Sequence, residues 1–321
     1  MSPQSITPGD RRAISKELSR LASAGIADIL SSPGIEAEWQ AHVIGVTGPP
    51  GAGKSTLIGR LAAHRIRTVA PAAIVAIDPT SPLSDGSILG DRTRMDALSE
   101  DPRIFIRSLP SRSAEDGLTH NLAELVTALD SHGFAEVFVE TVGVGQSAYG
   151  IRSVADVEVL VLTPGAGDYI QALKAGIMET ADIFVVNKAD LPGADAVAND
   201  LLGIRRHGSA GPHPPLVQVR LGSELGVVEL SDAIDAHRVA LAGSETTAAR
   251  LQMRRKFRLQ RLLQRTLLQV IARMPNGSWR EPLRDDFIRA VDQLCDNAHI
   301  ACQRPPRPPA TGSAGTDNGA R

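Results

Sequence analysis

The sequence has 321 residues, of which 42% are hydrophobic and 22% charged, and its formal net charge is −2. This composition fits one large globular domain with an extension, and the near-neutral charge gives no overall reason to expect a nucleic-acid partner. No run of roughly 18 or more apolar residues is present and MSPQSITPGDRR at the N-terminus lacks an apolar signal core, so neither a membrane span nor secretion is expected. Cys295 and Cys302 give neither a disulfide framework nor zinc-ligand spacing. We expect a cytoplasmic α/β protein.

The first predicted elements are one or two helices within residues 10–31, where Ile14, Leu18, Leu21 and Ile26 follow a helical spacing. Short apolar runs then alternate with helical segments. These runs are, in chain order, 42–48, 72–79, 103–109, 135–141, 157–164, 182–188 and the shorter 215–219. Runs rich in Val and Ile and separated by helices predict a mostly parallel, doubly wound sheet covered on both faces. Ligands of such sheets bind at the carboxyl ends of the strands.

The character of the sequence changes after residue 243. Residues 250–274 carry a helical stripe of apolar side chains, and a second helix is predicted at about 281–300. The final residues are rich in Pro, Gly and Ser and are predicted to be disordered. The predicted organisation is an N-terminal helical segment, an α/β domain, a helical extension and a disordered tail, at residues 1–41, 42–243, 244–302 and 303–321.

Residues 48–56 read GPPGAGKST and match G-x-x-x-x-G-K-[ST], the phosphate-binding loop of P-loop proteins. The motif follows a predicted strand and precedes the predicted helix TLIGRLAAH, which is the context it requires. Glycines let backbone N–H groups converge on phosphate oxygens, Lys54 supplies positive charge to the terminal phosphates, and Ser55 supplies a hydroxyl ligand for Mg²⁺. The predicted nucleotide-binding residues are Gly48, Pro49, Pro50, Gly51, Ala52, Gly53, Lys54, Ser55 and Thr56.

Residues 187–190 read NKAD at the end of a predicted strand. In GTPases the Asn of this motif braces the phosphate-binding loop, the Lys stem covers the base, and the Asp accepts hydrogen bonds from guanine N1–H and the exocyclic amine. Adenine presents an acceptor at the matching edge, so Asp190 would lack a partner there. Asn187, Lys188 and Asp190 therefore predict GTP as the substrate in preference to ATP.

Three carboxylates stand where they could face a hydrated Mg²⁺, which favours carboxylate oxygens. Asp78 and Glu140 each end an apolar run, and Asp91 begins the segment DRTRMDAL. With Ser55 they form the predicted Mg²⁺ ligand set. Asp78 could instead only form an Asp-Pro turn, and Asp91 could only cap a helix.

The segment ETVGVGQSA, at 140–148, is typical of a strand end that senses the last phosphate. Glu140 can hold Mg²⁺ through a water and the Gly143 N–H can meet the γ-phosphate, so these two and Lys54 are the predicted catalytic residues. A water-orienting Gln usually follows this glycine directly, whereas Gln146 comes three residues later. Slow intrinsic hydrolysis, completed by a partner, is therefore predicted.

These motifs resemble those of the MeaB/ArgK family of G proteins, which includes the human MMAA protein. The resemblance rests on GPPGAGKST, on AIDPTSPLSDGSILGDRTRM, on FIRSLPSR, on ETVGVGQS, on the long stretch at 163–191 and on the helical C-terminal extension. It implies a chaperone that couples GTP binding and hydrolysis to the cofactor loading and protection of an adenosylcobalamin-dependent acyl-CoA mutase. The mutase, and not this chain, would bind the cobalamin.

The resemblance also implies particular switch positions. Asp78 and Asp91 match residues of the first switch, and 165–174 matches a mobile segment that signals to the mutase. The positions assigned in that segment are Gly165, Asp168, Gln171 and Lys174. The chain departs from the family pattern at Ala148, where the family has Glu, and beyond residue 191, where LGSELG occupies the place of the base-contacting loop and Ser223 is the candidate contact.

Other functions stay open at this point. Ala148 suggests a nucleotide-bound scaffold whose hydrolysis has decayed. A metallochaperone GTPase shares the broad fold but needs a metal cluster, and the eight histidines are scattered. A kinase or a transport accessory driven by ATP conflicts with the NKAD motif.

The predicted helix at 250–274 is strongly basic at its start. Residues 250–265 contain seven Lys or Arg and no acidic residue. A solvated face and a homodimer interface both fit, and the family resemblance implies the second. A nucleic-acid face lacks the accompanying aromatic platform, so neither nucleic acid nor membrane is an expected partner.

Overall fold

A computed structural model describes residues 5–32, 38–78, 96–111, 119, 121–141, 147–165, 181–207, 213–241, 246–274 and 283–303. The chain divides into two compact units, the first drawn from residues 1–23 and 38–261 and the second from 24–37 and 262–321. The division follows which residues pack together. The domain boundaries expected after residues 41 and 243 stay a prediction.

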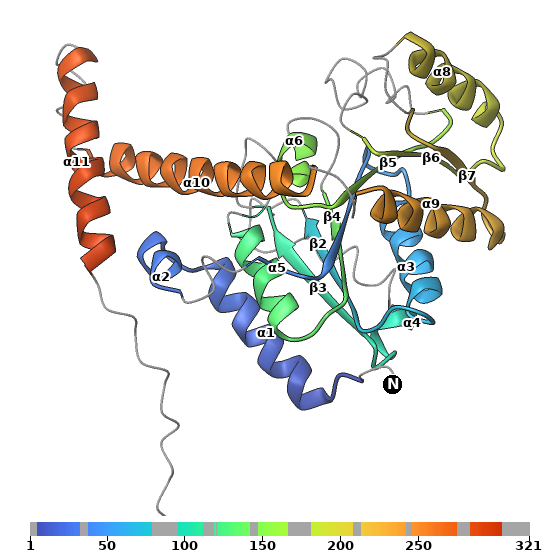
Figure 1. The fold of residues 1–321 in the computed structure, drawn as a ribbon, viewed down its shortest axis with the longest axis horizontal. Helices are drawn as coiled ribbons and strands as arrows, with labels where there is room; N and C mark the ends of the chain where they lie inside the picture. Colours follow the sequence, from blue (N-terminus) through green and yellow to red (C-terminus); the bar gives the residue numbers. More distant parts are fainter. Residues whose placement is uncertain are drawn as a thin grey trace, which may run out of the picture. The chain divides into compact units, whose positions relative to one another are not determined.

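The first unit is built on a seven-stranded sheet. Its strands are β1 (His42–Thr47), β2 (Ala72–Asp78), β3 (Ile104–Pro110), β4 (Glu136–Glu140), β5 (Val157–Leu162), β6 (Ile183–Asn187) and β7 (Leu216–Val219). They lie in the order β3-β2-β4-β1-β5-β6-β7, and every neighbouring pair is parallel (Figure 1). Each of the seven apolar runs is a strand, so the predicted parallel sheet is confirmed.

Helices cover both faces of this sheet (Figure 1). They are α1 (Pro8–Ala22), α3 (Lys54–Arg65), α4 (Asp96–Ser99), α5 (Leu122–Ser131), α6 (Ser147–Arg152), α8 (Ala194–His207), α9 (Leu225–Leu241) and the first turns of α10 (Thr246–Arg273). Side chains of α1, α5, α6 and α8 pack on one face, and those of α3 and α9 on the other. Because both faces are buried, the central strands are mostly apolar, with charged residues such as Glu136, Glu140 and Glu158 as exceptions.

Local chemistry explains where α1 begins. The Asp10 N–H donates to the Thr7 hydroxyl at 3.2 Å, and the Thr7 N–H donates to the Asp10 carboxylate at 3.0 Å, which is a reciprocal capping box. Pro8 follows Thr7, where a missing N–H is tolerated. Ile14, Leu18 and Leu21 then share one face of the helix and are buried in the core.

The order of the strands determines where a ligand can bind. β1 lies between β4 and β5, with Val46 opposite Glu140 on one side and Val159 on the other. The chain leaves β1 for α3 and then β2, which pairs with β4 on the side away from β1. The carboxyl end of β1 is therefore a point where neighbouring connections diverge, and ligands of open α/β sheets bind there.

The second unit contains α2 (Ile26–Leu30), the later turns of α10 and α11 (Leu283–Gln303). Val270, Met274 and Ala290 form a small buried cluster, and the Arg265 guanidinium donates to the Ala24 carbonyl at 2.8 Å. Helices were predicted from the sequence in all three of these regions. The tail after residue 303 lies outside the described residues. None of the described helices combines the length and apolar character that crossing a bilayer requires.

Candidate nucleotide-binding site

The loop between β1 and α3 requires glycine at two positions. A Cβ at Gly48 would lie 2.2 Å from the Val161 carbonyl oxygen, and a Cβ at Gly53 would lie 2.6 Å from the Asn187 amide nitrogen. Gly53 also has φ +84°, a left-handed conformation that L side chains rarely adopt. The loop therefore lies against the Val161 backbone on one side and the Asn187 side chain on the other, at the N-terminus of a twelve-residue helix. This arrangement suits an anion, because backbone N–H groups and the positive end of the helix dipole converge there.

Lys54 is held inside this loop. Its side chain is 6% exposed, and its ammonium donates to the carbonyl oxygens of Gly48 at 2.9 Å and Pro49 at 3.1 Å. A buried ammonium needs such acceptors because burial of an unpaired charge is costly. The contacts hold a positive charge over the cradle, where the terminal phosphates of a nucleotide would bring negative charge.

Ser55 and Glu140 meet beside the cradle. The Ser55 hydroxyl donates to a Glu140 carboxylate oxygen at 2.8 Å, and both residues are 5% exposed. Asp78, which is 2% exposed, ends β2 directly beside β4, whose last residue is Glu140. A hydroxyl and two carboxylates at one edge of the sheet form a set of hard oxygen donors. These residues therefore fit Mg²⁺, which prefers such ligands and keeps several waters.

The NKAD side chains also lie at the cradle. The Asn187 amide donates to the Ala52 carbonyl at 2.8 Å, and the Lys188 ammonium donates to the Gly51 carbonyl at 2.8 Å. Lys188 has φ +54°, which is uncommon for a residue with a side chain. Asn187 thus ties the end of β6 to the phosphate-binding loop, although the two segments lie far apart in the sequence.

Asp190 faces the turn that follows β7. Its carboxylate accepts the Leu221 N–H at 2.9 Å, and this hydrogen bond is the main reason that the pKa of Asp190 lies below its ordinary value. The carboxylate is therefore charged at neutral pH and acts only as an acceptor, as guanine recognition requires. The sequence LGSELG does occupy the position beside NKAD. Ser223 lies in this turn, where its carbonyl accepts from Arg60.

Several predicted site residues fall outside the described residues. They are Asp91, Gly143, Asp168, Gln171 and Lys174, together with Gln146. The side chain of Ala148 is also outside the description. Gly165 is described: it follows β5, is exposed and has φ +84°. The assigned roles of all these positions stay predictions.

A buried ionic network, which the sequence did not predict, surrounds Arg65. Arg65, the last residue of α3, is 2% exposed, and its Nε donates to both carboxylate oxygens of Glu136 at 3.0 and 2.9 Å. Further donors of Arg65 reach the Ser231 hydroxyl and the Asp235 carboxylate, both at 2.8 Å, on α9. Glu136 is fully buried and begins β4, whose other end is Glu140. The network therefore joins the P-loop helix, the strand of the Mg²⁺ candidate Glu140, and α9.

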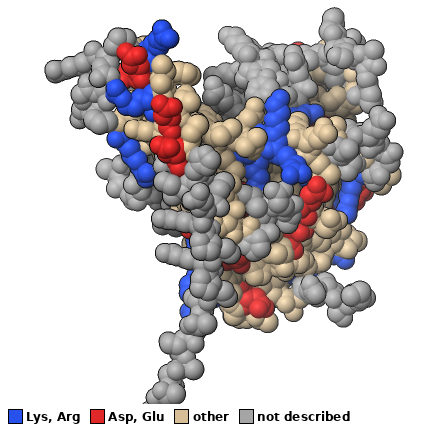
Figure 2. All heavy atoms as spheres, turned by 60° about the vertical axis from the view of Figure 1, so that its left-hand side comes forward, with Lys and Arg blue, Asp and Glu red and all other residues tan. Residues whose placement is uncertain are grey.

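Basic side chains in the first turns of α10 contact other parts of the first unit. Arg254 lies over the Trp39 ring at 4.6 Å and donates to the Asp156 carboxylate at 2.6 Å, and Arg258 donates to Glu124 at 2.8 Å. Figure 2 shows basic groups (blue) and acidic groups (red) interspersed on the face that it draws. Some of the positive charge on this helix therefore binds the chain itself, a use that the sequence analysis did not consider.

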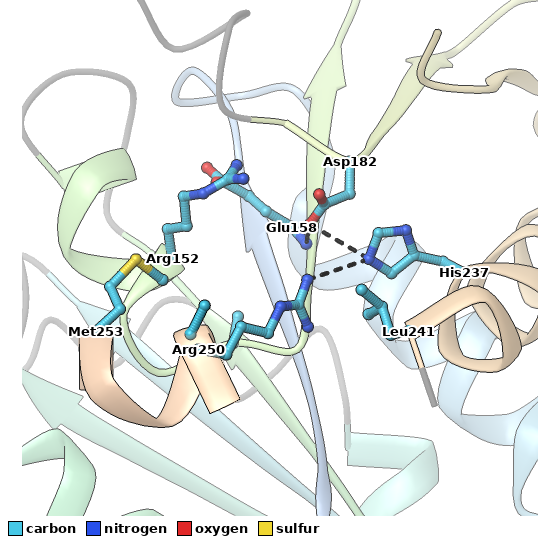
Figure 3. Close-up of a pocket in the computed structure, with 9 residues that line it drawn as sticks. Arg152, Glu158, Asp182, His237, Leu241, Arg250 and Met253 are labelled. Atoms are coloured by element: carbon cyan, nitrogen blue, oxygen red, sulfur yellow. Dashed lines mark hydrogen bonds and ion pairs between the residues drawn. The ribbon is translucent and has the colours of Figure 1, made fainter. Parts of the chain in front are cut away.

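A cavity of about 330 Å³ lies at the amino ends of β5 and β6 (Figure 3). It is lined by Arg152, Ala155, Glu158, Asp182, His237, Leu241, Ala249, Arg250 and Met253. His237 Nε2 lies 3.8 Å from Asp182 and 3.4 Å from an Arg250 nitrogen. Burial lowers the pKa of His237, opposed by Asp182 and reinforced by Arg250. These contacts join α9 to α10 at the amino ends of the strands, whereas the candidate nucleotide site lies at their carboxyl ends.

Comparison with known proteins agrees with this geometry. The family described as "Methylmalonyl Co-A mutase-associated GTPase MeaB" matches residues 22–276. A Pyrococcus abyssi protein named as a GTPase is 41% identical over 258 residues, which are 79% of this chain and 78% of that protein. The mitochondrial methylmalonic aciduria type A homolog of Mus musculus is 33% identical over 254 residues, 75% of this chain and 60% of the relative.

One further relative matches only part of the chain, and one solved structure resembles its fold. GTPase ArgK of Escherichia coli is 43% identical over 147 residues, 46% of this chain and 44% of the relative. The crystal structure of an LAO/AO transport system kinase superposes with a TM-score of 0.54 at 22% identity, over 92% of this chain and 100% of that one, which supports the fold. Because the family match spans most of the sequence, this chain belongs to the MeaB family of methylmalonyl Co-A mutase-associated GTPases.

Proposed function

We propose that this GTPase is Mg²⁺-dependent and acts as a chaperone for an adenosylcobalamin-dependent acyl-CoA mutase of the methylmalonyl-CoA mutase type. It couples GTP binding and hydrolysis to loading and protection of the mutase cofactor. The hydrogen bond of 2.8 Å between Ser55 and Glu140 carries the nucleotide part of this proposal. This hydrogen bond joins the P-loop serine to the carboxylate at the end of β4, the two side chains that are proposed to hold Mg²⁺ near the last phosphate.

Each described side chain has a task in this proposal. Lys54 neutralises the terminal phosphates, while Ser55, Asp78 and Glu140 hold Mg²⁺ directly or through water. Bound Mg²⁺ supplies positive charge at the phosphate oxygens as negative charge develops there during phosphoryl transfer. Asn187 keeps the loop in register with the base site, and the charged Asp190 accepts from the guanine edge.

The hydrolytic step is proposed to be slow until a partner binds. A water-orienting Gln directly after the switch glycine is absent from the sequence, because Gly143 is followed by Val144. Binding of a mutase would then complete the geometry around the attacking water. The family description and the relative named for methylmalonic aciduria type A support this choice of partner.

The test measures phosphate release from GTP by the intact chain, alone and with a methylmalonyl-CoA mutase. We expect slow release alone and an increase of roughly 10- to 1,000-fold with the mutase, since partners that complete a GTPase site act at this scale or above. Lys54→Ala with the mutase controls for contaminating phosphatase. If the chain hydrolyses GTP but neither co-elutes with the mutase nor responds to it, the chaperone role is wrong and the GTPase assignment stands.

We also propose that the second unit mediates homodimer formation. Its helices α10 and α11 expose large apolar side chains: Leu263 is 50% exposed, Leu268 51%, Phe287 68% and Leu283 82%. Large apolar side chains exposed on two helices of one unit favour an interaction surface. Light scattering of the intact chain should give twice the mass of the 33.9 kDa protomer. A monomer at the concentrations used for the kinetic measurements would overturn the proposal.

A further inference from the structure

Arg60 connects the P-loop helix to the turn beside the base site. It lies on α3, five positions after Ser55, and its guanidinium donates to the Arg220 carbonyl at 3.1 Å and to the Ser223 carbonyl. Its charge is also 3.9 Å from the Glu224 carboxylate. Residues 220 and 223 are the first and last residues of one turn, in which the Ser223 N–H reaches the Arg220 carbonyl at 3.4 Å. One side chain therefore binds both ends of the turn.

The same turn holds Asp190. Leu221, the second residue of the turn, donates its N–H to the Asp190 carboxylate at 2.9 Å. Gly222, the third residue, has φ +75°, as a type II turn requires. A continuous series of hydrogen bonds thus runs from Arg60 through the backbone of the turn to the Asp190 carboxylate, the group proposed to bind the base.

The turn has little apolar packing to hold it in place. Arg220, Leu221 and Gly222 are all exposed, and Leu221 is 78% exposed. A surface segment with few buried contacts opens readily unless hydrogen bonds hold it. The planar guanidinium suits this task because it can donate to two carbonyl oxygens at once, which an ammonium cannot do with the same fixed geometry.

We propose that Arg60 is a positioning residue for guanine selectivity. It fixes the 220–223 turn, the turn fixes the orientation of the Asp190 carboxylate, and that orientation decides how well the guanine N1–H and amine are bound. The inference rests on the proposed role of Asp190 in base recognition. It predicts that losing Arg60 weakens discrimination between bases and leaves phosphate binding and turnover at saturating GTP unchanged.

The experiment compares binding of GDP, IDP and ADP to the wild-type chain, Arg60→Ala, Arg60→Lys and Arg67→Ala. Arg67 is exposed and follows the same helix, so Arg67→Ala is the matched control. Arg60→Ala should weaken GDP binding about tenfold, the scale of losing charge-assisted hydrogen bonds, and leave ADP binding unchanged. Arg60→Lys should fall between Arg60→Ala and wild type, and kcat at saturating GTP should not change.

The outcomes separate the positioning role from its alternatives. If the thermal midpoint of Arg60→Ala falls but the ratio of GDP to ADP affinity is that of wild type, Arg60 is merely structural and the proposal is overturned. Equal weakening of GDP and ADP would place its effect on the phosphates and overturn it as well. If the wild-type chain itself does not prefer GDP to ADP, the assignment of Asp190 fails, which is a different result.

Discussion

Replacing Lys54 by alanine is expected to lower kcat/KM for GTP by about 10²–10³-fold, the usual cost of removing one preorganised charge or donor from a transition state. The buried ammonium is already held over the cradle by the Gly48 and Pro49 carbonyls. It therefore needs no reorganisation when charge develops on the terminal phosphates. Initial rates of phosphate release over a range of GTP concentrations measure the effect.

The control variant is Lys256→Ala. Lys256 is exposed on α10, and its replacement by alanine removes the same positive charge from the chain. Circular dichroism should show that Lys54→Ala keeps its fold, since α3 is covered by apolar packing on the sheet. A Lys54→Ala chain with wild-type kcat/KM would mean that the hydrolytic centre lies elsewhere.

The largest expected effect on stability comes from Glu136. Changing Glu136 to Gln leaves the buried Arg65 guanidinium without its main countercharge, which typically costs about 3–5 kcal/mol of unfolding free energy. Burial opposes the charge on Arg65, but its hydrogen bonds to Glu136 and then Asp235 hold the Arg65 pKa above its ordinary value. Urea unfolding of the two chains measures the difference. Glu229→Gln on α9 is the matched control, because Glu229 is exposed.

The pH dependence of this difference has a definite sign. Burial alone would raise the pKa of Glu136, but the His42 ring, whose Nδ1 lies 3.9 Å from the carboxylate, and the hydrogen bonds from Arg65 hold the folded-state pKa below the ordinary value of 4.5. A carboxyl group with a lowered folded pKa stabilises above its unfolded pKa and loses this contribution as pH falls through the folded pKa. The free energy by which wild type exceeds Glu136→Gln in unfolding stability should therefore be largest at neutral pH and should decrease below about pH 4.5. An advantage that grows on acidification would contradict the network.

Local sequence patterns predicted the elements whose causes are local. The seven apolar runs became strands because each is long enough to span a sheet buried on both faces. GPPGAGKST and NKAD were recognisable because each places its chemistry within a few consecutive residues. The helices within 10–31 and 250–274 followed from their apolar spacing.

The long-range polar contacts could not be predicted in the same way. Arg65 and Glu136 are 71 positions apart, and Arg60 and Ser223 are 163 apart. Nothing near Glu136 distinguishes it from a carboxylate at an exposed strand end. Only the pairing of β4 with β1 and β2, and the packing of α3 and α9 on the same face, bring these partners together. The partners of the basic residues at the start of α10 could not be predicted for the same reason, since Arg254 and Arg258 contact Asp156 and Glu124 far along the chain.

The P-loop and the carboxylate that reads guanine, Asp190, are expected to act in one site. A direct measurement is phosphate release from GTP by the intact chain, with ATP added in roughly tenfold excess. Adenine would present an acceptor to the Asp190 carboxylate and leave it without a hydrogen-bond donor, so ATP should compete poorly. We expect GTP turnover to continue with little inhibition, and the Asp190→Ala chain to lose this preference. Hydrolysis of ATP at the rate of GTP, or full competition by ATP, would contradict the account.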